Sequence, residues 1–321
     1  MGDVLSFQAI LERLADEKRS LPVSFLHRFS DLEPEQVKQF QQVWLKIPRE
    51  RKREFLENLA DLAESDTLLS FEDLALSLVG DPDGHVRTLS IRLLQDSEDR
   101  KLIPVLEDIL QNDAEAEPRA TAATGLGRFI YLGEIEEIPE RSLHEVEEHL
   151  LVAAQSAKEV LVRRRALEAL GSSSRPEVPP MIDKAYKSKE ADWKISALYA
   201  MGVSSDDRWD KQVLANLTNQ DEAIRYEAIL AAGRIPLKSA RSILLDLLAD
   251  EEDADILQAI TWALSEIGGE GVREQLEEML ETATDEEQEE FLEEALENLD
   301  FTEGISLFGR LDADEDSNEG E

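Results

Sequence analysis

Two histidines of the chain come close to a spacing that binds zinc. His144 and His149 lie at the ends of the segment His-Glu-Val-Glu-Glu-His. Two histidines four residues apart share one face of a helix and can bind one metal ion. At five residues apart their rings point about 140° away from each other, so only a His144/Glu148 pair stays geometrically possible. Because no third ligand accompanies that pair, we interpret the segment as a solvated helix face and predict no metal site.

A second acidic segment begins like a calcium-binding loop. Residues 312–318 read Asp-Ala-Asp-Glu-Asp-Ser-Asn, with acids at the first, third and fifth positions. The pattern then departs from the loop twice, because Ser317 stands where glycine makes the turn and no glutamate follows at the twelfth position. We expect this segment to attract divalent cations only weakly.

The other side chains form no recognisable catalytic set. The chain has no cysteine, no glycine-rich phosphate loop and no grouping of serine, histidine and aspartate. An enzyme would therefore lack a nucleophile, a base and a cofactor site. We predict that the chain is not an enzyme and binds no cofactor.

Composition also bears on the compartment and on the class of partner. The absence of cysteine fits a reducing compartment, residues 1–20 lack the apolar core of a secretory signal, and no apolar run is long enough to span a membrane. The 321 residues include 72 acids and 34 bases, for a formal net charge of −38. Such a chain repels phosphate, which disfavours nucleic acids and anionic membranes. We expect a cytoplasmic monomer with a protein partner, and the charge favours a basic one.

The acidic charge is concentrated at one end. Residues 250–321 contain 27 acids and two bases, so most of the excess lies there. The middle of the chain, around residues 163–189, is locally basic. The charge therefore excludes a basic groove along the whole chain, and it leaves room for one local anionic contact in the middle.

A short pattern of residues recurs along the chain and indicates which helical elements position the side chains discussed above. Alanine followed five residues later by glycine recurs at spacings of 44, 31, 31 and 35 residues, and four of the five copies carry a base three residues before the alanine. We call this pattern the Ala/Gly column. Its members are Ala122/Gly127, Ala166/Gly171, Ala197/Gly202, Ala228/Gly233 and Ala263/Gly268. Ser90 with Arg87 extends it upstream without the glycine, and together these copies indicate a repeat protein.

Each copy is readable as a pair of helices. Near Ala228, Asp221 is placed to cap the first helix, Gly233 is placed to end it in the left-handed conformation, and residues 237–249 form the second helix. Apolar residues at −4, 0, +1 and +4 from each alanine fall on one face, with the small alanine at its centre. In a single helix pair that apolar face would be exposed to water, so we expect neighbouring pairs to stack and bury it.

These segments resemble the HEAT-repeat family, in particular its short class of phycobilisome-lyase-type repeats. The resemblance rests on Asp-Pro-Asp-Gly-His-Val-Arg at residues 81–87, on Val162 to Gly171 and on Ile224 to Ala228, and it covers residues 70–300. The chain also resembles bacterial HEAT-repeat proteins without an assigned activity. The resemblance implies an all-α fold, a right-handed α-solenoid of helix pairs. It also implies that the basic column, Arg87, Arg119, Arg163, Lys194 and Arg225, pairs with carboxylates at adjacent repeat turns.

The predicted organisation has four parts. Residues 1–66 form an N-terminal helical cap, and residues 67–284 form about six repeats with an insertion near 125–139 that protrudes as a loop. Residues 285–300 form a C-terminal cap helix, apolar on one side and rich in glutamate elsewhere, and residues 301–321 form an acidic disordered tail.

The outward face of the first helices provides the candidate binding site. Its −2, −1 and +2 positions are expected to be solvated, and the early repeats place Ala120, Thr121, Thr124, Arg164, Arg165 and Glu168 there. The later repeats place Ile195, Tyr199, Tyr226, Leu230 and Trp262 there instead, which predicts a protein-binding patch. The alternative is that curvature or the C-terminal segment buries these residues as core. Two other surfaces stay open: the second helices, which line the concave side of HEAT superhelices, and the acidic tail.

Taken together, the sequence favours a non-catalytic scaffold or adaptor for protein–protein interaction, with association steered by negative potential. One alternative is an accessory lyase subunit of the phycobilin-lyase type, which HEAT-like folds include. Another is an acidic, chaperone-like or nucleic-acid-mimicking binder of a basic protein.

Overall fold

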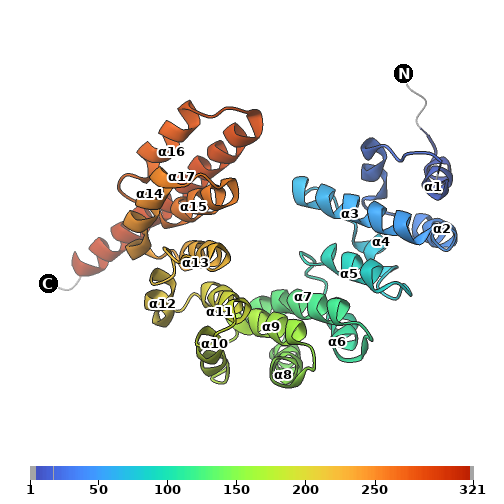
Figure 1. Cartoon of the computed structure of the whole chain (residues 1–321), viewed down its shortest axis with the longest axis horizontal. Coiled ribbons are helices and arrows are strands. Elements are labelled where there is room, and N and C mark those ends of the chain that lie inside the picture. The colour runs from blue at the N-terminus through green and yellow to red at the C-terminus, as the bar shows by residue number, and fades with distance from the viewer. Residues whose placement is uncertain (1–4, 17, 319–321) are drawn as a thin grey trace. The chain divides into compact units, whose positions relative to one another are not determined.

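A computed structural model describes residues 5–16 and 18–318, and every regular element in that part of the chain is a helix (Figure 1). The chain divides into two compact units, residues 1–170 and residues 171–321. The predicted all-helical fold of stacked helix pairs is confirmed within each unit.

The first unit contains four helices ahead of the first repeat and then the repeats themselves. Its elements are α1 (Phe7–Ala15), η1 (Val23–Phe29), α2 (Pro34–Trp44), α3 (Arg49–Ser65), α4 (Glu72–Leu76), α5 (Gly84–Arg92), α6 (Leu102–Asn112), α7 (Ala116–Glu134), α8 (Glu140–Ser156) and α9 (Val160–Ala169). Helices α3, α5, α7 and α9 pack successively in one row, and α6 and α8 form a second layer against that row.

The helices before the first repeat have an aromatic core of their own. The ring of Phe29 packs edge-on against Phe40 and Phe55, with centroids 6.0 and 4.8 Å apart. Trp44 lies against Phe40 at 5.1 Å and donates its indole hydrogen to the carboxylate of Asp81, 2.8 Å away. The same carboxylate accepts from Lys52 Nζ at 3.1 Å. This buried ion pair fastens α2 and α3 to the turn that starts the first repeat.

The turn also holds a second carboxylate against two arginines of α3. Asp83 caps α5 by accepting from the His85 amide, and it accepts from Arg53 Nη2 at 2.9 Å and from Arg49 Nε at 2.5 Å. The hydrogen bond from Arg53 lowers the pKa of Asp83 well below its usual range, although partial burial acts in the opposite direction. The Asp-Pro-Asp-Gly segment is therefore a structural junction.

The insertion near residues 125–139 does not protrude as a loop. Helix α7 continues to Glu134, and only residues 135–139 link it to α8. Leu126, Phe129 and Ile130 are buried at helical spacing, so burial of their side chains stabilises two further turns of helix. The long spacing between the second and third copies of the repeat thus comes from a longer first helix.

The second unit continues the same two-layer arrangement. Its elements are α10 (Val178–Tyr186), α11 (Ala191–Ser204), η3 (Asp207–Trp209), α12 (Asp210–Leu214), α13 (Glu222–Arg234), η4 (Lys238–Ala240), α14 (Arg241–Asp250), α15 (Ala254–Ile267), α16 (Val272–Glu281) and α17 (Glu286–Asn318), after the short turn η2 (Leu170–Ser172). Helices α11, α13, α15 and α17 pack in a row, and α10, α12, α14 and α16 lie in the second layer (Figure 1). Asp221 caps α13 as predicted, its carboxylate accepting from the Ile224 amide at 3.2 Å.

The column glycines serve close packing between helices, and the prediction that Gly233 ends its helix in the left-handed conformation is wrong. Gly233 lies inside α13, and a Cβ added there would meet the Trp262 ring at 2.6 Å and the Cα of Ala263 at 3.0 Å. A Cβ on Gly202 would lie 2.9 Å from the Cα of Ala231 in the next helix of the row. Gly268 does end its helix, as the C-cap of α15 with φ +59° and ψ −173°, a backbone conformation that favours glycine but is not the left-handed helical one.

The basic column lies among acceptors at the repeat turns. Arg87 holds Asp113 through two hydrogen bonds of 2.7 Å, Arg119 contacts Glu159 at 2.9 Å, and Arg225 approaches Glu251 at 3.9 Å. The predicted pairing with carboxylates is confirmed at these three positions.

The other two members of the basic column have different partners. Arg163 donates to the carbonyl oxygens of Ala157 and Lys158. The Lys194 ammonium lies over the Tyr186 ring, 5.6 Å from its centroid. All five positions therefore form structural contacts, as expected for a column inside the packing face.

The C-terminal helix is longer than predicted. Helix α17 continues past residue 300 to Asn318, so the boundary between a cap helix and a disordered tail does not exist in the described backbone. Apolar residues at 301, 305, 308 and 311 continue the helical spacing of residues 292, 295 and 299, and glutamate and leucine are good helix formers. The calcium-loop segment falls on this helix up to residue 318, and residues 319–321 lie outside the described part of the chain.

Candidate functional site

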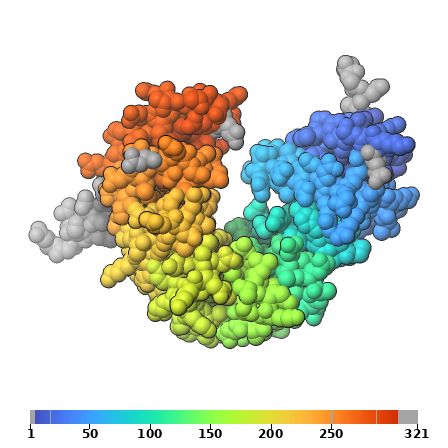
Figure 2. Space-filling model, in the orientation of Figure 1, coloured from blue at the N-terminus to red at the C-terminus, as the bar shows by residue number. Residues whose placement is uncertain are grey.

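The five predicted contact residues lie on three consecutive helices of the second unit. We call them the aromatic face: Ile195 and Tyr199 on α11, Tyr226 and Leu230 on α13, and Trp262 on α15. Tyr226 is 36% exposed and the other four are partly exposed, so none is buried as core. The three helices pack side by side, and their part of the chain is coloured yellow to orange in Figure 2. The structure brings all five to one row of helices, and their role in binding stays a prediction.

A charged pair that sequence reasoning missed lies within the aromatic face. Arg234 stacks its guanidinium over the Tyr199 ring, 4.6 Å from the centroid, and donates to Glu227 at 2.7 Å. Glu227 is only 9% exposed. Arg234 follows the column glycine directly, and that position relative to the repeat is the signal that could have identified it. The pair holds the Tyr199 ring in one orientation and places an arginine between aromatic side chains.

Trp262 is positioned by the column glycine of the preceding repeat. Its ring lies over Gly233, where a methyl group would come within 2.6 Å. The indole therefore packs against the backbone of α13. Aromatic side chains have few rotatable bonds, so they lose little conformational entropy when a partner covers them.

The outward face is less solvated in the early repeats than predicted. Ala120 and Glu168, both expected in solvent, are buried at 3% and 6% exposure. Each neighbouring first helix covers part of this face in the row, and Glu168 receives a hydrogen bond from Arg165. Thr124 is exposed as predicted.

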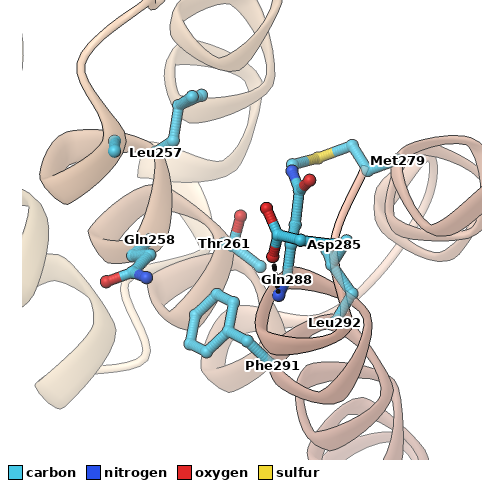
Figure 3. Close-up of a pocket in the computed structure, with 9 residues that line it drawn as sticks. Leu257, Gln258, Thr261, Met279, Asp285, Gln288, Phe291 and Leu292 are labelled. Carbon is cyan, nitrogen blue, oxygen red and sulfur yellow. Dashed lines mark hydrogen bonds between the residues drawn. The ribbon is translucent and has the colours of Figure 1, made fainter. Parts of the chain in front are cut away.

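A pocket opens at the acidic end of the second unit, between α15 and the start of α17 (Figure 3). Its volume is about 400 Å³. The lining residues are Ala254, Leu257, Gln258, Thr261, Met279, Asp285, Gln288, Phe291 and Leu292. Thr261 lines the pocket although the residue is only 1% exposed. Sequence periodicity gave no indication of this pocket, because its walls come from three helices.

Two aspartates cap the helices that meet at the pocket. Asp253 accepts from the amides of Asp255 and Ile256, which starts α15. Asp285 accepts from the Gln288 amide at 2.9 Å, the bond drawn dashed in Figure 3, and so starts α17. Each cap satisfies a free backbone donor and places a carboxylate where the helix carries partial positive charge.

The histidine pair of the first unit has separate neighbours. His149 contacts Glu107 of α6 at 2.7 Å, whereas His144 lies 4.0 Å from Glu140, one turn earlier on its own helix. The two rings thus point to different carboxylates, in keeping with the wide angle between them. No three potential ligands of the kinds His, Cys, Asp and Glu gather at one point within residues 5–16 and 18–318. Over the same residues, no helix combines the length and the apolar character that a membrane crossing requires.

A comparison with protein families finds a match in the repeat region. The family model for HEAT repeats matches residues 210–297, which span α12 to α17. No curated protein matches the chain in sequence.

Solved structures similar to the chain include three at 18% identity. The Escherichia coli protein YibA covers 89% of this chain and 98% of its own, with a TM-score of 0.43. An engineered protein covers 92% and 88%, with a TM-score of 0.38, and human deoxyhypusine hydroxylase covers 81% and 95%, with a TM-score of 0.35. The family match falls on two helix pairs of the second unit that carry the Ala/Gly column, so residues 210–297 contain HEAT repeats.

Proposed function

We propose that the chain is a non-catalytic scaffold for protein–protein interaction and that its partner binds the aromatic face. The observation that carries the proposal is the row of partly exposed Ile195, Tyr199, Tyr226, Leu230 and Trp262 across α11, α13 and α15. Tyrosine, tryptophan and arginine dominate the energetic centres of protein interfaces. HEAT repeats commonly mediate protein interactions, which is in keeping with this assignment.

Two contacts hold side chains of the aromatic face in place. Arg234 stacks on Tyr199 while bound to Glu227, and the Trp262 ring packs against Gly233. A preorganised surface loses less conformational entropy on binding than a flexible one, so more of its apolar burial appears as affinity. A partner that covers Tyr226 and Leu230 therefore gains apolar contact without first ordering those helices.

The proposal is tested by affinity purification from the cells that make the chain, with quantitative mass spectrometry. The test variant combines Tyr226→Ala with Leu230→Ser. The matched control combines Val152→Ser with Val160→Ser, which removes two apolar side chains of the first unit that are 61% and 43% exposed. We expect at least one protein to be captured by the wild type and the control and to fall about tenfold with the test variant. Circular dichroism checks that both variants fold. Equal capture of every protein by all three chains refutes the proposal.

A further inference from the structure

The pocket between α15 and α17 combines apolar walls with several polar side chains. Leu257, Met279 and Phe291 form the apolar part. Thr261 supplies a hydroxyl to the lining although the residue is only 1% exposed (Figure 3). Asp285 uses one carboxylate oxygen to cap α17 and presents the other at the same pocket.

The charge around the pocket selects the kind of ligand. Exposed acids flank the lining residues in the sequence: Asp253 and Asp255 stand on either side of Ala254, and Glu286 and Glu289 follow Asp285 and Gln288. Among residues 250–304 the single base is Arg273, which is already bound to Asp300 at 2.5 Å and to Glu303 at 3.1 Å. The starts of α15 and α17 would favour an anion, but their caps Asp253 and Asp285 already supply one. The surroundings therefore favour a cation and exclude an acidic ligand.

We propose that this pocket takes the side chain of a lysine or arginine from a basic segment of the protein partner. The inference rests on the proposed function, because the partner that covers the aromatic face on α15 would also reach the pocket on that helix. Such a side chain has an aliphatic stem that fits against Phe291 and Met279 and a cationic head that donates to Asp285 and Thr261. The volume of about 400 Å³ is ample for one side chain.

The chain offers a direct spectroscopic probe of this pocket. It contains four methionines, and Met279 lines the pocket whereas Met201 is fully buried elsewhere. The full chain, labelled with ¹³C at the methionine methyl groups, is titrated with the peptide acetyl-Gly-Ser-Lys-Leu-Lys-Leu-Lys-Ser-Gly-amide. A second peptide replaces each lysine by norleucine, which keeps the stem and removes the charge. Anisotropy of fluorescein-labelled versions gives the affinities in 150 mM NaCl.

Three variants separate the pocket from general attraction between opposite charges. Asp285→Asn removes the charge but keeps a good capping residue, and Thr261→Val removes the hydroxyl at nearly constant volume. Glu277→Gln removes one exposed acid of α16 outside the pocket as the matched control. We expect the Met279 signal to shift with the lysine peptide and not with the norleucine peptide. We expect affinity to fall about tenfold in Asp285→Asn, several-fold in Thr261→Val and less than twofold in Glu277→Gln.

Any of three results overturns the inference: equal affinity of the three variants for the lysine peptide, a Met279 signal that does not shift, or equal binding of the norleucine peptide. If Tyr226→Ala abolishes capture of the cellular partner while Asp285→Asn leaves it intact, the pocket assignment fails and the proposed function stands. If Asp285→Asn weakens the peptide but the aromatic-face variant retains every captured protein, the proposed function fails separately.

Discussion

Replacing Gly202 by alanine tests the close approach of helices on which the second unit depends. The new Cβ would lie 2.9 Å from the Cα of Ala231 and 3.2 Å from the Cδ of Arg234. Carbon atoms prefer about 3.5–4.0 Å, and backbone cannot yield as a flexible side chain can. Overpacking costs about 1–3 kcal/mol, with the upper half of that range expected here, whereas the gain in helix propensity is about 1 kcal/mol. We expect a net destabilisation of about 1–2 kcal/mol, or a fall in Tm of about 2–8 °C.

The assay is urea and thermal unfolding followed by tryptophan fluorescence. Three of the four tryptophans, Trp193, Trp209 and Trp262, lie in the second unit, so the signal reports mainly that unit. Gly80→Ala is the control, because a Cβ there meets nothing within 4 Å and its effect on stability should stay within about 1 kcal/mol. If Gly202→Ala were as stable as the wild type or more stable, helix propensity would have won. The column glycines would then have no packing role.

Three further predictions concern the junctions of the first unit. Burial acts to raise the pKa of Asp113, but the hydrogen bonds from Arg87 and from the Glu115 amide, together with the charges of Arg87 and Arg119, lower it. The stabilising effect of Asp113 is therefore complete above about pH 5 and is lost as the pH falls through the folded pKa. Urea midpoints from pH 7 to pH 3 should therefore fall more steeply in the wild type than in Asp113→Asn. At pH 7 that variant should itself lose about 1–3 kcal/mol, measured by urea unfolding. Lys52→Met should cost about 3–5 kcal/mol, because it leaves the Asp81 carboxylate buried beside Trp44 without its ion pair.

Specific results would contradict these predictions. If the urea midpoints of the wild type and of Asp113→Asn fell equally steeply from pH 7 to pH 3, the ion pair between Asp113 and Arg87 would make no pH-dependent contribution to stability. An unchanged urea midpoint in Lys52→Met would show that the indole hydrogen bond alone satisfies the Asp81 carboxylate. Lys101→Met, whose side chain is 91% exposed, removes a lysine at the surface and should change stability by less than about 0.5 kcal/mol.

Much of the fold could be predicted because the repeat is written in local spacing. Around Ala228, burial of Ile224, Ile229 and Ala232 follows the predicted packing face, and the Asp221 cap follows from residue type alone. That Arg87 pairs with a carboxylate at the next repeat turn was implied by the resemblance to HEAT repeats, and the structure identifies that carboxylate as Asp113. The predicted loop at 125–139 was wrong because burial of Phe129 and Ile130 extends α7, and the short gap before α8 gives no local sign of that.

The candidate site was predictable only in part. The repeat placed Tyr199, Tyr226 and Trp262 on the outward face of successive first helices, since each stands one or two residues from the alanine of its repeat. Whether they stay exposed depends on how much of each helix the next one covers, and Ala120 and Glu168 show that the same offset is buried elsewhere. The pocket at Thr261 and Asp285 brings together residues 24 positions apart on different helices, for which spacing carries no signal.

The sequence by itself therefore determined the helical repeat, the apolar face of each first helix, the structural place of the basic column and the concentration of acids at one end. Each of these follows from residue type and the period of a helix. Tertiary structure decided that the glycines serve close approach, that the aromatic face stays partly open with Arg234 within it, and that a pocket lies beside α17. These depend on distances between helices about 30 residues apart, and such distances are set by side-chain volume at the contact, not by periodicity along one helix.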